Sequence, residues 1–521
     1  MRGVLIVVGL VGIATVVSAF ARRTSVPAPS LLVIAGLVVG LIPGTPHIQV
    51  EPGVISLVVL PPLLYAAGEE LPWRDLKAVW RPVAVLAVGL VLVSAAAVGA
   101  VAVAAVGLPV AEAFLLGTVL ASTDPVAVTA LGRRLALPSR LQTLVQAESL
   151  FNDATSLILF RIAVGVVVAG GAISVGTVAW DFVRLALGGA AIGAAVAAVI
   201  ALIRLRTEDP LVETVVTLLT PYLAYVAAEV AHASGVTAVV VASVILGVLA
   251  PRLSGSRTRL QAEAVHGTVV FVLESVVFAL IGLELPGLIE ELSSSDQRWL
   301  LPSLAIAATL VLVRLAWVYP LALIRRRGGG DGGRSVWQVS AVVSWAGARG
   351  VIPLAAALSI PLLDDAGRPL ADRDLLQVLA IAVIVISLVV QGFTLGPLVR
   401  RAGLAVPKAD TEVEYARARL EVAEAGLAYV DELAAREAVP QVVLEQVRRS
   451  LQTRVELARD GAGDAEDVDI GRTYREVRRE VVSVQARLLA RMYADGSLGE
   501  TTRRRLQRQL DVEDARFDDD R

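Results

Sequence analysis

The feature that most constrains the fold of this chain is a series of long apolar runs separated by short charged clusters. Hydrophobic residues make up 56% of the 521 residues and charged residues only 18%, whereas about a quarter of an ordinary soluble protein is charged. A helix needs about 20 mostly apolar residues to cross a bilayer. About thirteen runs reach or approach that length, at residues 3–21, 30–43, 53–68, 82–106, 111–132, 141–169, 182–203, 211–232, 236–250, 264–289, 299–324, 336–360 and 375–399. We therefore expect an all-α polytopic membrane protein, with residues 1–405 in the lipid bilayer as about 13 transmembrane helices.

The basic residues support this number of crossings because they collect on alternate loops. Loops that follow odd-numbered runs carry 20 Lys and Arg residues. The N-terminus and the other loops carry only Arg2, Arg298, Arg368 and Arg373, apart from Arg184 at a helix end. Since cytoplasmic loops of membrane proteins are enriched in Lys and Arg, we predict a multi-pass protein of the cell membrane with its N-terminus outside and its C-terminus in the cytoplasm.

Residues 406–521 have a different composition, rich in Arg, Glu and Asp. Leu444, Val447, Leu451 and Val455 recur at three- and four-residue steps, a spacing typical of an amphipathic helix. We expect a cytosolic, charged helical tail, which forms a small domain or a coiled coil rather than a second enzyme. Regulatory interactions of this tail remain an open alternative.

An acidic residue lies at a predicted helix break in the fifth run, where Ser122, Thr123, Asp124 and Pro125 follow one another. Pro125 has no N–H to donate and disfavours helical geometry at the residue before it. The break frees backbone carbonyls, such as that of Thr123, beside the Asp124 carboxylate, and hard cations prefer such oxygen ligands. A simple proline kink is the alternative, but a carboxylate at the kink favours a functional site.

A second polar group lies in the sixth run, where Glu148, Ser149, Asn152 and Asp153 fall within six residues. Residues four apart share a helix face, so Ser149 and Asp153 project together, with Glu148 and Asn152 beside them. A charge at the bilayer centre costs about 2.5–3.5 kcal/mol on insertion scales. Packing alone therefore explains this group poorly, and its composition indicates function.

The twelfth run is also predicted to be broken, because Gly347, Gly350 and Pro353 surround Arg349. Arg349 lies well inside the run, so we expect it to need an anionic partner rather than to reach the membrane surface. If runs 1–6 and 8–13 are two repeats, the broken helices are the fifth of each. Paired interrupted helices are typical of secondary transporters with inverted repeats and a binding site near the bilayer midplane.

Other charges inside or beside apolar runs are weaker candidates for function. Glu274 lies within the tenth run, and Glu69 and Glu70 lie at the end of the third. Arg161 and Arg314 also lie within apolar runs, where each is open to interpretation as half of a structural ion pair.

At these residues the chain resembles the bacterial sodium/proton exchangers of the monovalent cation/proton antiporter family, of the electroneutral Asn-Asp type related to animal sodium/proton exchangers. The matching stretches are STDPVAV at Ser122, ESLFNDATSLILF at Glu148 and GARGVIPLA at Gly347, with looser matches at Leu60 and Phe271. They follow the family's order across the membrane region, and ESLFNDA is the most specific. The resemblance implies a homodimer whose protomers each move a core domain, with two crossing broken helices, against a dimerisation domain.

The resemblance also implies the roles of the site residues. It makes Asp153 the carboxylate that binds the monovalent cation or the proton, with Asp124, the Thr123 carbonyl and Ser149 completing the site. The supporting residues that it implies are Asn152, beside that aspartate, and Glu148 and Arg349, as a buried ion pair. Many relatives carry an acidic residue where this chain has Ala66. Glu69 and Glu70 are the candidates to substitute for it, and the resemblance does not assign the third run a role.

The function expected from this resemblance is secondary active antiport rather than enzymatic catalysis. Na⁺ (or Li⁺) would exchange for H⁺ by alternating access, with no cofactor and, because residue 152 is Asn, without net charge movement. The alternatives are a K⁺/H⁺ antiporter with the same mechanism, a cation channel, and a membrane sensor that transports nothing. The chain has no cysteine and three histidines, which disfavours an intramembrane enzyme, and its net charge of −2 gives no reason to expect a nucleic-acid partner.

Overall fold

The structure is a computed structural model of the full chain. It describes residues 2–21, 26–43, 55–125, 139–170, 175–207, 209–292, 298–326, 336–370, 372–403, 408–435 and 440–460, with a few positions between 481 and 506. The chain separates into two compact units, Met1–Ala405 and Val406–Arg521. The described secondary structure in both units is helical, apart from two isolated β-bridges in the first unit.

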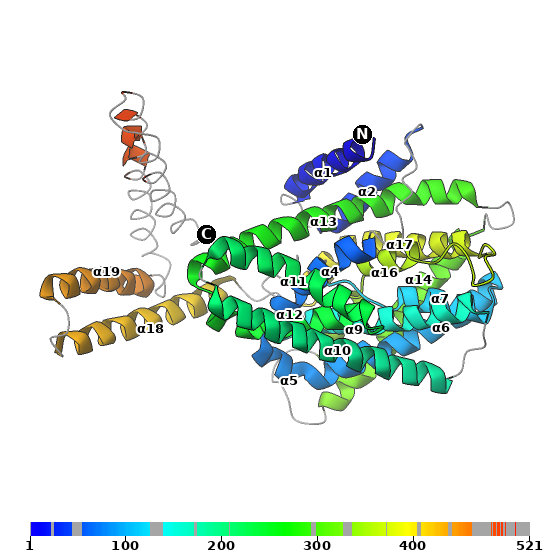
Figure 1. Ribbon diagram of the computed structural model, residues 1–521, viewed down its shortest axis with the longest axis horizontal. Coiled ribbons are helices and arrows are strands. Elements are labelled where there is room, and N and C mark those ends of the chain that lie inside the picture. The colour runs from blue at the N-terminus through cyan, green and yellow to red at the C-terminus, as the bar shows by residue number, and fades with distance from the viewer. Residues whose placement is uncertain are drawn as a thin grey trace. The chain divides into compact units, whose positions relative to one another are not determined.

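Most of the described helices of the first unit lie roughly alongside one another (Figure 1). They are α1 (Arg2–Ala21), α2 (Ala28–Gly40), η1 (Ile55–Val59), α4 (Leu60–Glu69), α5 (Trp73–Ala84), η2 (Val85–Leu90), α6 (Val91–Val106), α7 (Val110–Leu120), α9 (Ser139–Val168), α10 (Val175–Arg206), α11 (Pro210–Val230), α12 (Gly235–Leu253), α13 (Ser256–Glu291), α14 (Leu300–Arg326), α15 (Val336–Trp345), α16 (Val351–Leu358) and α17 (Arg373–Arg401). The labels η1 and η2 denote π-helical turns.

Each predicted apolar run overlaps one of these helices or consecutive ones, and residues 53–54 of the third run and 126–132 of the fifth run lie outside the described residues. Eight helical stretches are long and apolar enough to cross a membrane, and shorter apolar helices accompany them. The prediction of an all-helical membrane protein is therefore confirmed.

The segment before the fourth run forms a helix where we expected a loop. Helix α5 continues through η2 into α6 as one helical stretch from Trp73 to Val106. Leu76, Val79 and Val83 recur at three- and four-residue steps and are buried, which stabilises α5 as an amphipathic helix. Pro82 has no N–H to donate, and a π-helical turn, a common accommodation of an interrupted helix, follows at η2.

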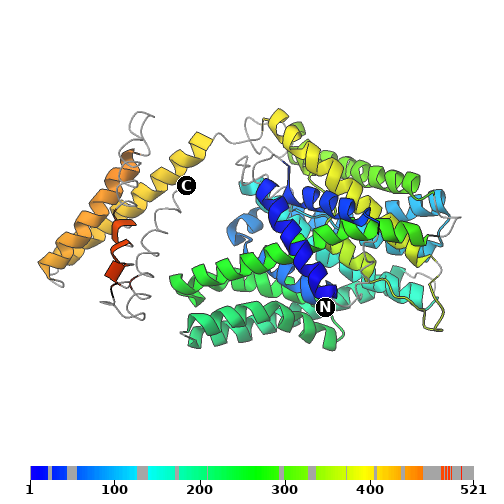
Figure 2. The ribbon, with the colours of Figure 1, turned by 90° about the horizontal axis from the view of Figure 1, so that it is seen from above.

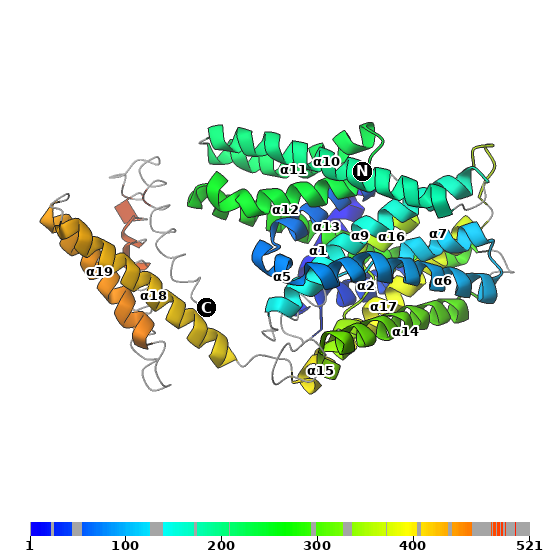
Figure 3. The ribbon, with the colours of Figure 1, turned by 90° about the horizontal axis from the view of Figure 1, so that it is seen from below.

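Two groups of helices lie along opposite edges of the first unit. Figure 3 shows α10, α11 and α12 side by side along one edge and α14, α15 and α17 along the other. Helices α7, α9 and α16 lie between these groups and contact one another. The segments that carry the predicted site residues therefore share the interior of the unit.

Helices α2 and α13 approach so closely that only glycine fits at their contact. A Cβ atom on Gly36 would overlap the backbone of Ala279, and a Cβ atom on Gly282 would overlap the backbone of Val33. Helix α1 packs against both helices (Figure 2). Small residues allow this approach, which gives helices in a bilayer their van der Waals contact.

In the second unit, α18 (Lys408–Ala435) and α19 (Gln441–Asp460) pack side by side (Figure 1). Val430, Leu444 and Val455 are buried, and an Arg448–Asp431 ion pair joins the two helices. Leu444 and Val455 belong to the predicted apolar stripe, so this part of the amphipathic pattern is confirmed.

Candidate functional site

The end of one helix and the break between two others meet inside the first unit. Helix α7 ends at Leu120, after which the chain continues without helical geometry to Pro125, and α15 and α16 are separated by residues 346–350. The Asp124 N–H donates a hydrogen bond to the Ala348 carbonyl at 2.7 Å, which forms an isolated antiparallel bridge. The predicted break in the twelfth run is therefore confirmed, and the fifth run leaves helical geometry before Pro125, with its continuation beyond Pro125 outside the described residues.

Asp124 faces the N-terminus of α16. The Val351 N–H donates to its Oδ2 atom at 3.3 Å. N–H groups in the first turn of a helix have no partner within the helix and carry partial positive charge, so the carboxylate neutralises this helix end. Gly350 is required for the approach, because a Cβ atom there would overlap the Asp124 carboxyl group.

Arg349 is buried and binds backbone carbonyls rather than a carboxylate. Its Nε atom donates to the Leu120 carbonyl at 3.1 Å, and its Nη1 atom donates to the Gly347 carbonyl. Leu120 is the last residue of α7, and carbonyls at a helix C-terminus carry partial negative charge without an intrahelical partner. The guanidinium group therefore stabilises the C-terminal end of α7.

The predicted ion pair between Glu148 and Arg349 is wrong, because Glu148 pairs with Arg314 of α14. The Arg314 Nη1 and Nη2 atoms donate to the two Glu148 carboxylate oxygens at 2.5 and 2.8 Å. The two side chains are 2% and 1% exposed. The Arg314 Nε atom also donates to the Val343 carbonyl at 3.1 Å. Arg349 thus donates its hydrogen bonds to backbone carbonyls. Glu148 instead accepts two hydrogen bonds from Arg314, the strong geometry for an arginine and a carboxylate.

Two side chains on one face of α9 hold Thr123 in the break after α7. The Ser149 hydroxyl donates to the Thr123 carbonyl at 2.5 Å. Asn152 donates from Nδ2 to the Thr123 hydroxyl at 2.6 Å and accepts from the Thr123 N–H through Oδ1 at 3.4 Å. These contacts bring polar groups of the fifth and sixth runs together.

Asp153 lines a cavity of about 380 Å³ together with Asp124, Thr123 and Ser149. The residue is 5% exposed, and its Oδ1 atom has no hydrogen-bond partner among the described residues. A buried carboxylate oxygen without a hydrogen-bond partner is costly unless a ligand or a proton satisfies it. The four predicted cation-site residues therefore share one cavity, and one carboxylate oxygen in it is available to a ligand.

Two of the three weaker acidic candidates for function line the cavity that contains Asp153. Glu70 and Glu274 line the same cavity as Asp153, and so does Ala66, whereas Glu69 is not among its lining residues. The side chain of Glu70 is exposed and that of Glu274 is half-buried. Two additional carboxylates thus face the approach to Asp153.

Sequence reasoning missed several polar residues that support the site. Ser387 of α17 accepts from the Arg349 N–H at 3.1 Å and donates to the Gln391 side chain at 3.0 Å. Arg314 is different: the sequence offers it as half of a structural ion pair without naming the partner, and its pair with Glu148 confirms that interpretation. An arginine inside an apolar run is a usable signal for a buried pair, but the choice of partner requires the positions of α9, α14 and α15.

Comparison with known proteins identifies the family. Residues 11–401 match the family model described as the transmembrane region of sodium/hydrogen exchangers. This chain belongs to the sodium/hydrogen exchanger family. It is a multi-pass membrane transporter, a monovalent cation/proton antiporter, and not an enzyme.

Similar proteins occur in several bacteria. An uncharacterised Na⁺/H⁺ exchanger of Mycobacterium tuberculosis is 31% identical over 536 residues, covering 99% of this chain and 96% of the relative. The Na⁺/H⁺ antiporter ApNhaP of Aphanothece halophytica is 34% identical over 396 residues, covering 75% and 73%. A sodium, potassium, lithium and rubidium/H⁺ antiporter of Bacillus subtilis is 29% identical over 403 residues, covering 74% and 59%.

The fold is also similar to a solved structure. The sodium proton antiporter MjNhaP1 from Methanocaldococcus jannaschii, at pH 8, aligns with a TM-score of 0.61 and 19% identity, over 77% of this chain and 100% of that chain. At this identity the likeness shows a shared fold.

Proposed function

We propose that this exchanger carries Na⁺ (or Li⁺) in exchange for H⁺ across the cytoplasmic membrane by alternating access. Asp153 binds either the cation or the proton, and the protein changes conformation only when the site is filled. The observation that carries this proposal is the buried Asp153 Oδ1 atom, which has no hydrogen-bond partner among the described residues, in a residue that lines a cavity together with Asp124, Thr123 and Ser149. Carboxylate, carbonyl and hydroxyl oxygens suit a small hard cation.

The charges of the site residues support electroneutral exchange of one cation for one proton. Asn152 is uncharged and holds Thr123. Glu148 and Arg314 form a buried pair that contributes no net charge. Asp124 accepts the Val351 N–H at the N-terminus of α16, an environment that favours the ionised carboxylate throughout the cycle. Of Asp124 and Asp153, the two carboxylates among the proposed cation-site residues, Asp153 is then the one that exchanges a proton.

The membrane topology in this proposal has thirteen crossings, built as two inverted repeats, with the N-terminus outside and the C-terminus in the cytoplasm. The alternating distribution of Lys and Arg supports it. In this orientation the N-terminal end of α9 is cytoplasmic, since Arg133, Arg134 and Arg140 precede or begin it. The homodimer rests on the resemblance to the family alone, and the mass of the purified protein in detergent tests it.

The experiment is ion exchange in sealed proteoliposomes with an internal pH-sensitive dye, comparing wild type with Asp153→Asn. Asn keeps the side-chain size but neither ionises nor exchanges a proton, so we expect exchange to be lost while the protein still folds. Asp374→Asn is the matched control, because Asp374 is an exposed carboxylate paired with Arg373 and does not line the cavity. Wild-type exchange by Asp153→Asn would refute the role of Asp153.

The second candidate is K⁺/H⁺ exchange by the same mechanism. It is favoured by the Bacillus subtilis relative, whose name includes potassium and rubidium. The same liposomes, supplied with Li⁺, Na⁺, K⁺ and Rb⁺ in turn, separate the two. A larger response to K⁺ than to Na⁺ at equal concentration would establish the second candidate.

A further inference from the structure

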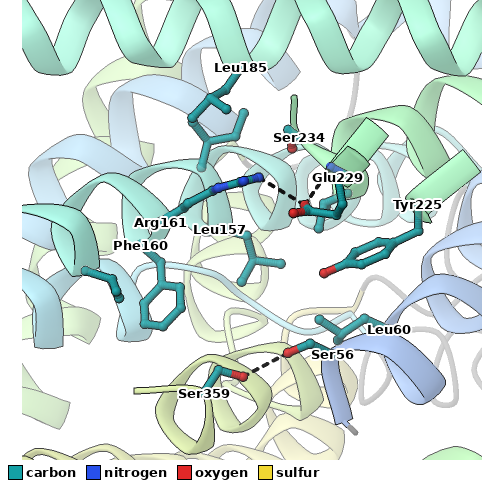
Figure 4. Close-up of a pocket in the computed structure, with 14 residues that line it drawn as sticks. Ser56, Leu60, Leu157, Phe160, Arg161, Leu185, Tyr225, Glu229, Ser234 and Ser359 are labelled. Carbon is teal, nitrogen blue, oxygen red and sulfur yellow. Dashed lines mark hydrogen bonds and ion pairs between the residues drawn. The ribbon is translucent and has the colours of Figure 1, made fainter. Parts of the chain in front are cut away.

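Figure 4 shows the residues that line a second cavity, of about 190 Å³. This cavity lies on the opposite side of Asp153 from the larger one. Its position follows from three elements that line both cavities but at different residues. The larger cavity is lined by residues 146–153 of α9, 63–70 of α4 and its end, and 351–353 of α16, whereas the second is lined by residues 157–164, 56–60 and 359. Along each of these elements, the residues of the larger cavity thus lie toward one end and those of the second cavity toward the other.

A tightly packed layer separates the two cavities. On α9 it consists of Ala154, Thr155 and Ser156, all buried, and on α16 of residues 354–358, also buried. Four residues of α-helix, from Asp153 to Leu157, rise about 6 Å. Asp153 is therefore accessible from one cavity and shut off from the other by about one helical turn.

Hydrogen bonds at the second cavity join α9 to the helices at the edge of the unit. Arg161 points toward Glu229 of α11 across the cavity (Figure 4), and its Nη1 atom donates to Glu229 Oε1 at 3.0 Å. The same nitrogen donates to the Ala233 carbonyl, in the turn between α11 and α12, at 3.0 Å. Glu229 also accepts from the Gly235 N–H at 3.3 Å, so it stays anchored at the N-terminus of α12 if Arg161 withdraws.

A second contact crosses the same boundary between η1 and the end of α16. The hydroxyl groups of Ser56 and Ser359 lie 2.8 Å apart. Because the Ser359 hydroxyl donates to the Ala355 carbonyl at 2.6 Å, Ser56 is the donor between the two serines. In each contact one partner lies on α9 or at the end of α16, the two helices next to Asp153 and Asp124. The other partner lies on α11 or η1.

The accessibility of this ion pair distinguishes it from the pair next to Asp153. The Arg161 and Glu229 side chains are 40% and 37% exposed, whereas Arg314 and Glu148 are almost fully buried. An accessible pair exchanges its contact for water at modest cost, but separating a fully buried pair leaves uncompensated charges. The Arg161–Glu229 pair is thus suited to break and reform, and the Arg314–Glu148 pair is suited to persist.

We propose that Arg161 with Glu229, and Ser56 with Ser359, form a gate that closes the outer side of the exchanger while Asp153 faces the cytoplasmic cavity. The gate opens when α9 and α16 move relative to η1 and α11, which merges the second cavity with the path to Asp153. This inference rests on the proposed function, which assigns the second cavity to the outside of the cell.

The test uses the absence of native cysteine to place one reporter thiol in each cavity. Leu157→Cys reports on the second cavity, between the gate and Asp153, and Ala67→Cys reports on the larger one. A membrane-impermeant thiol reagent is applied to right-side-out vesicles for the first and to everted vesicles for the second. Each reporter is measured with and without Arg161→Gln.

We expect Arg161→Gln to speed labelling of Leu157→Cys by about two- to fivefold, the population shift expected when an accessible pair is lost, and to slow labelling of Ala67→Cys. Arg161→Lys should restore most of the wild-type rates. Arg184→Gln is the matched control, because Arg184 pairs with Asp181 at 3.6 Å on α10 and lines neither cavity. Ser56→Ala, which removes the second contact, gives an independent reading if Arg161→Gln does not fold.

Unchanged labelling of Leu157→Cys, in Arg161→Gln or its Ser56→Ala substitute, overturns the gate. Faster labelling of both reporters also overturns it, because this indicates a loosened fold rather than a shift between two states. Labelling does not depend on which residue binds the ion. If Asp153→Asn still exchanges ions while the reporters shift as expected, the proposed function fails and the gate stands.

Discussion

The ion pair between Glu148 and Arg314 gives a sharp prediction, because the pair is almost fully buried and joined by two hydrogen bonds of 2.5 and 2.8 Å. Removing one partner of such a pair leaves an uncompensated charge and costs about 3–5 kcal/mol. At about 1.4 kcal/mol per factor of ten, this lowers the ratio of folded to unfolded protein by about two to four powers of ten. Glu148→Gln and Arg314→Gln should each show a loss of this size.

The double variant Glu148→Gln with Arg314→Gln should lose much less than the sum of the two single variants, because no unpaired charge remains. Replacing a whole buried pair with neutral groups is often close to neutral in stability. The assay is reversible unfolding of the purified protein by SDS in mixed micelles, followed by tryptophan fluorescence. The same cycle with Arg349→Gln in place of Arg314→Gln is the comparison, since Arg349 contacts carbonyls. Additive losses for Glu148 and Arg314, or stronger coupling to Arg349, would refute the pairing.

Three further outcomes follow from the account of the site. Exchange rates in sealed proteoliposomes should not respond to an imposed membrane potential, and a marked acceleration without ion leak would point to Asp124 as a second proton carrier. A chain ending at Lys408 should still exchange ions, because every proposed site residue precedes it, and a folded but inactive truncation would make the tail part of the mechanism. Where Asp153 is mostly protonated, lowering the pH by one unit should raise the KM for the cation by up to about tenfold, and a pH-independent KM would exclude competition at one carboxylate.

The sequence predicted those parts of the fold that depend on local pattern. Apolar length located the helices, and Pro125 and Gly347 marked the two breaks. The four-residue spacing of Ser149 and Asp153 correctly placed both on the face of α9 that lines the cavity with Asp124. These features require only the period of one helix and the chemistry of one break.

The parts that the sequence did not predict depend on how separate helices pack. Two buried arginines, Arg314 and Arg349, were available to Glu148, and their spacing in the sequence does not distinguish them. The carbonyl of Leu120 at the end of α7 became the acceptor for Arg349, a role that only the crossing of the two breaks creates. Likewise, the second cavity is lined by residues of α9, α11 and η1 together. The position of Arg161 in the sequence therefore did not indicate a gate.

The measurement that tests the central role of Asp153 most directly is the number of protons released when the cation binds to purified protein in a weakly buffered detergent solution. At a pH where Asp153 is largely protonated, saturating Na⁺ should release close to one proton per protein chain, and Asp153→Asn should release none. Cation binding without proton release in the wild type, or undiminished release by Asp153→Asn, would contradict competition between Na⁺ and H⁺ for this carboxylate.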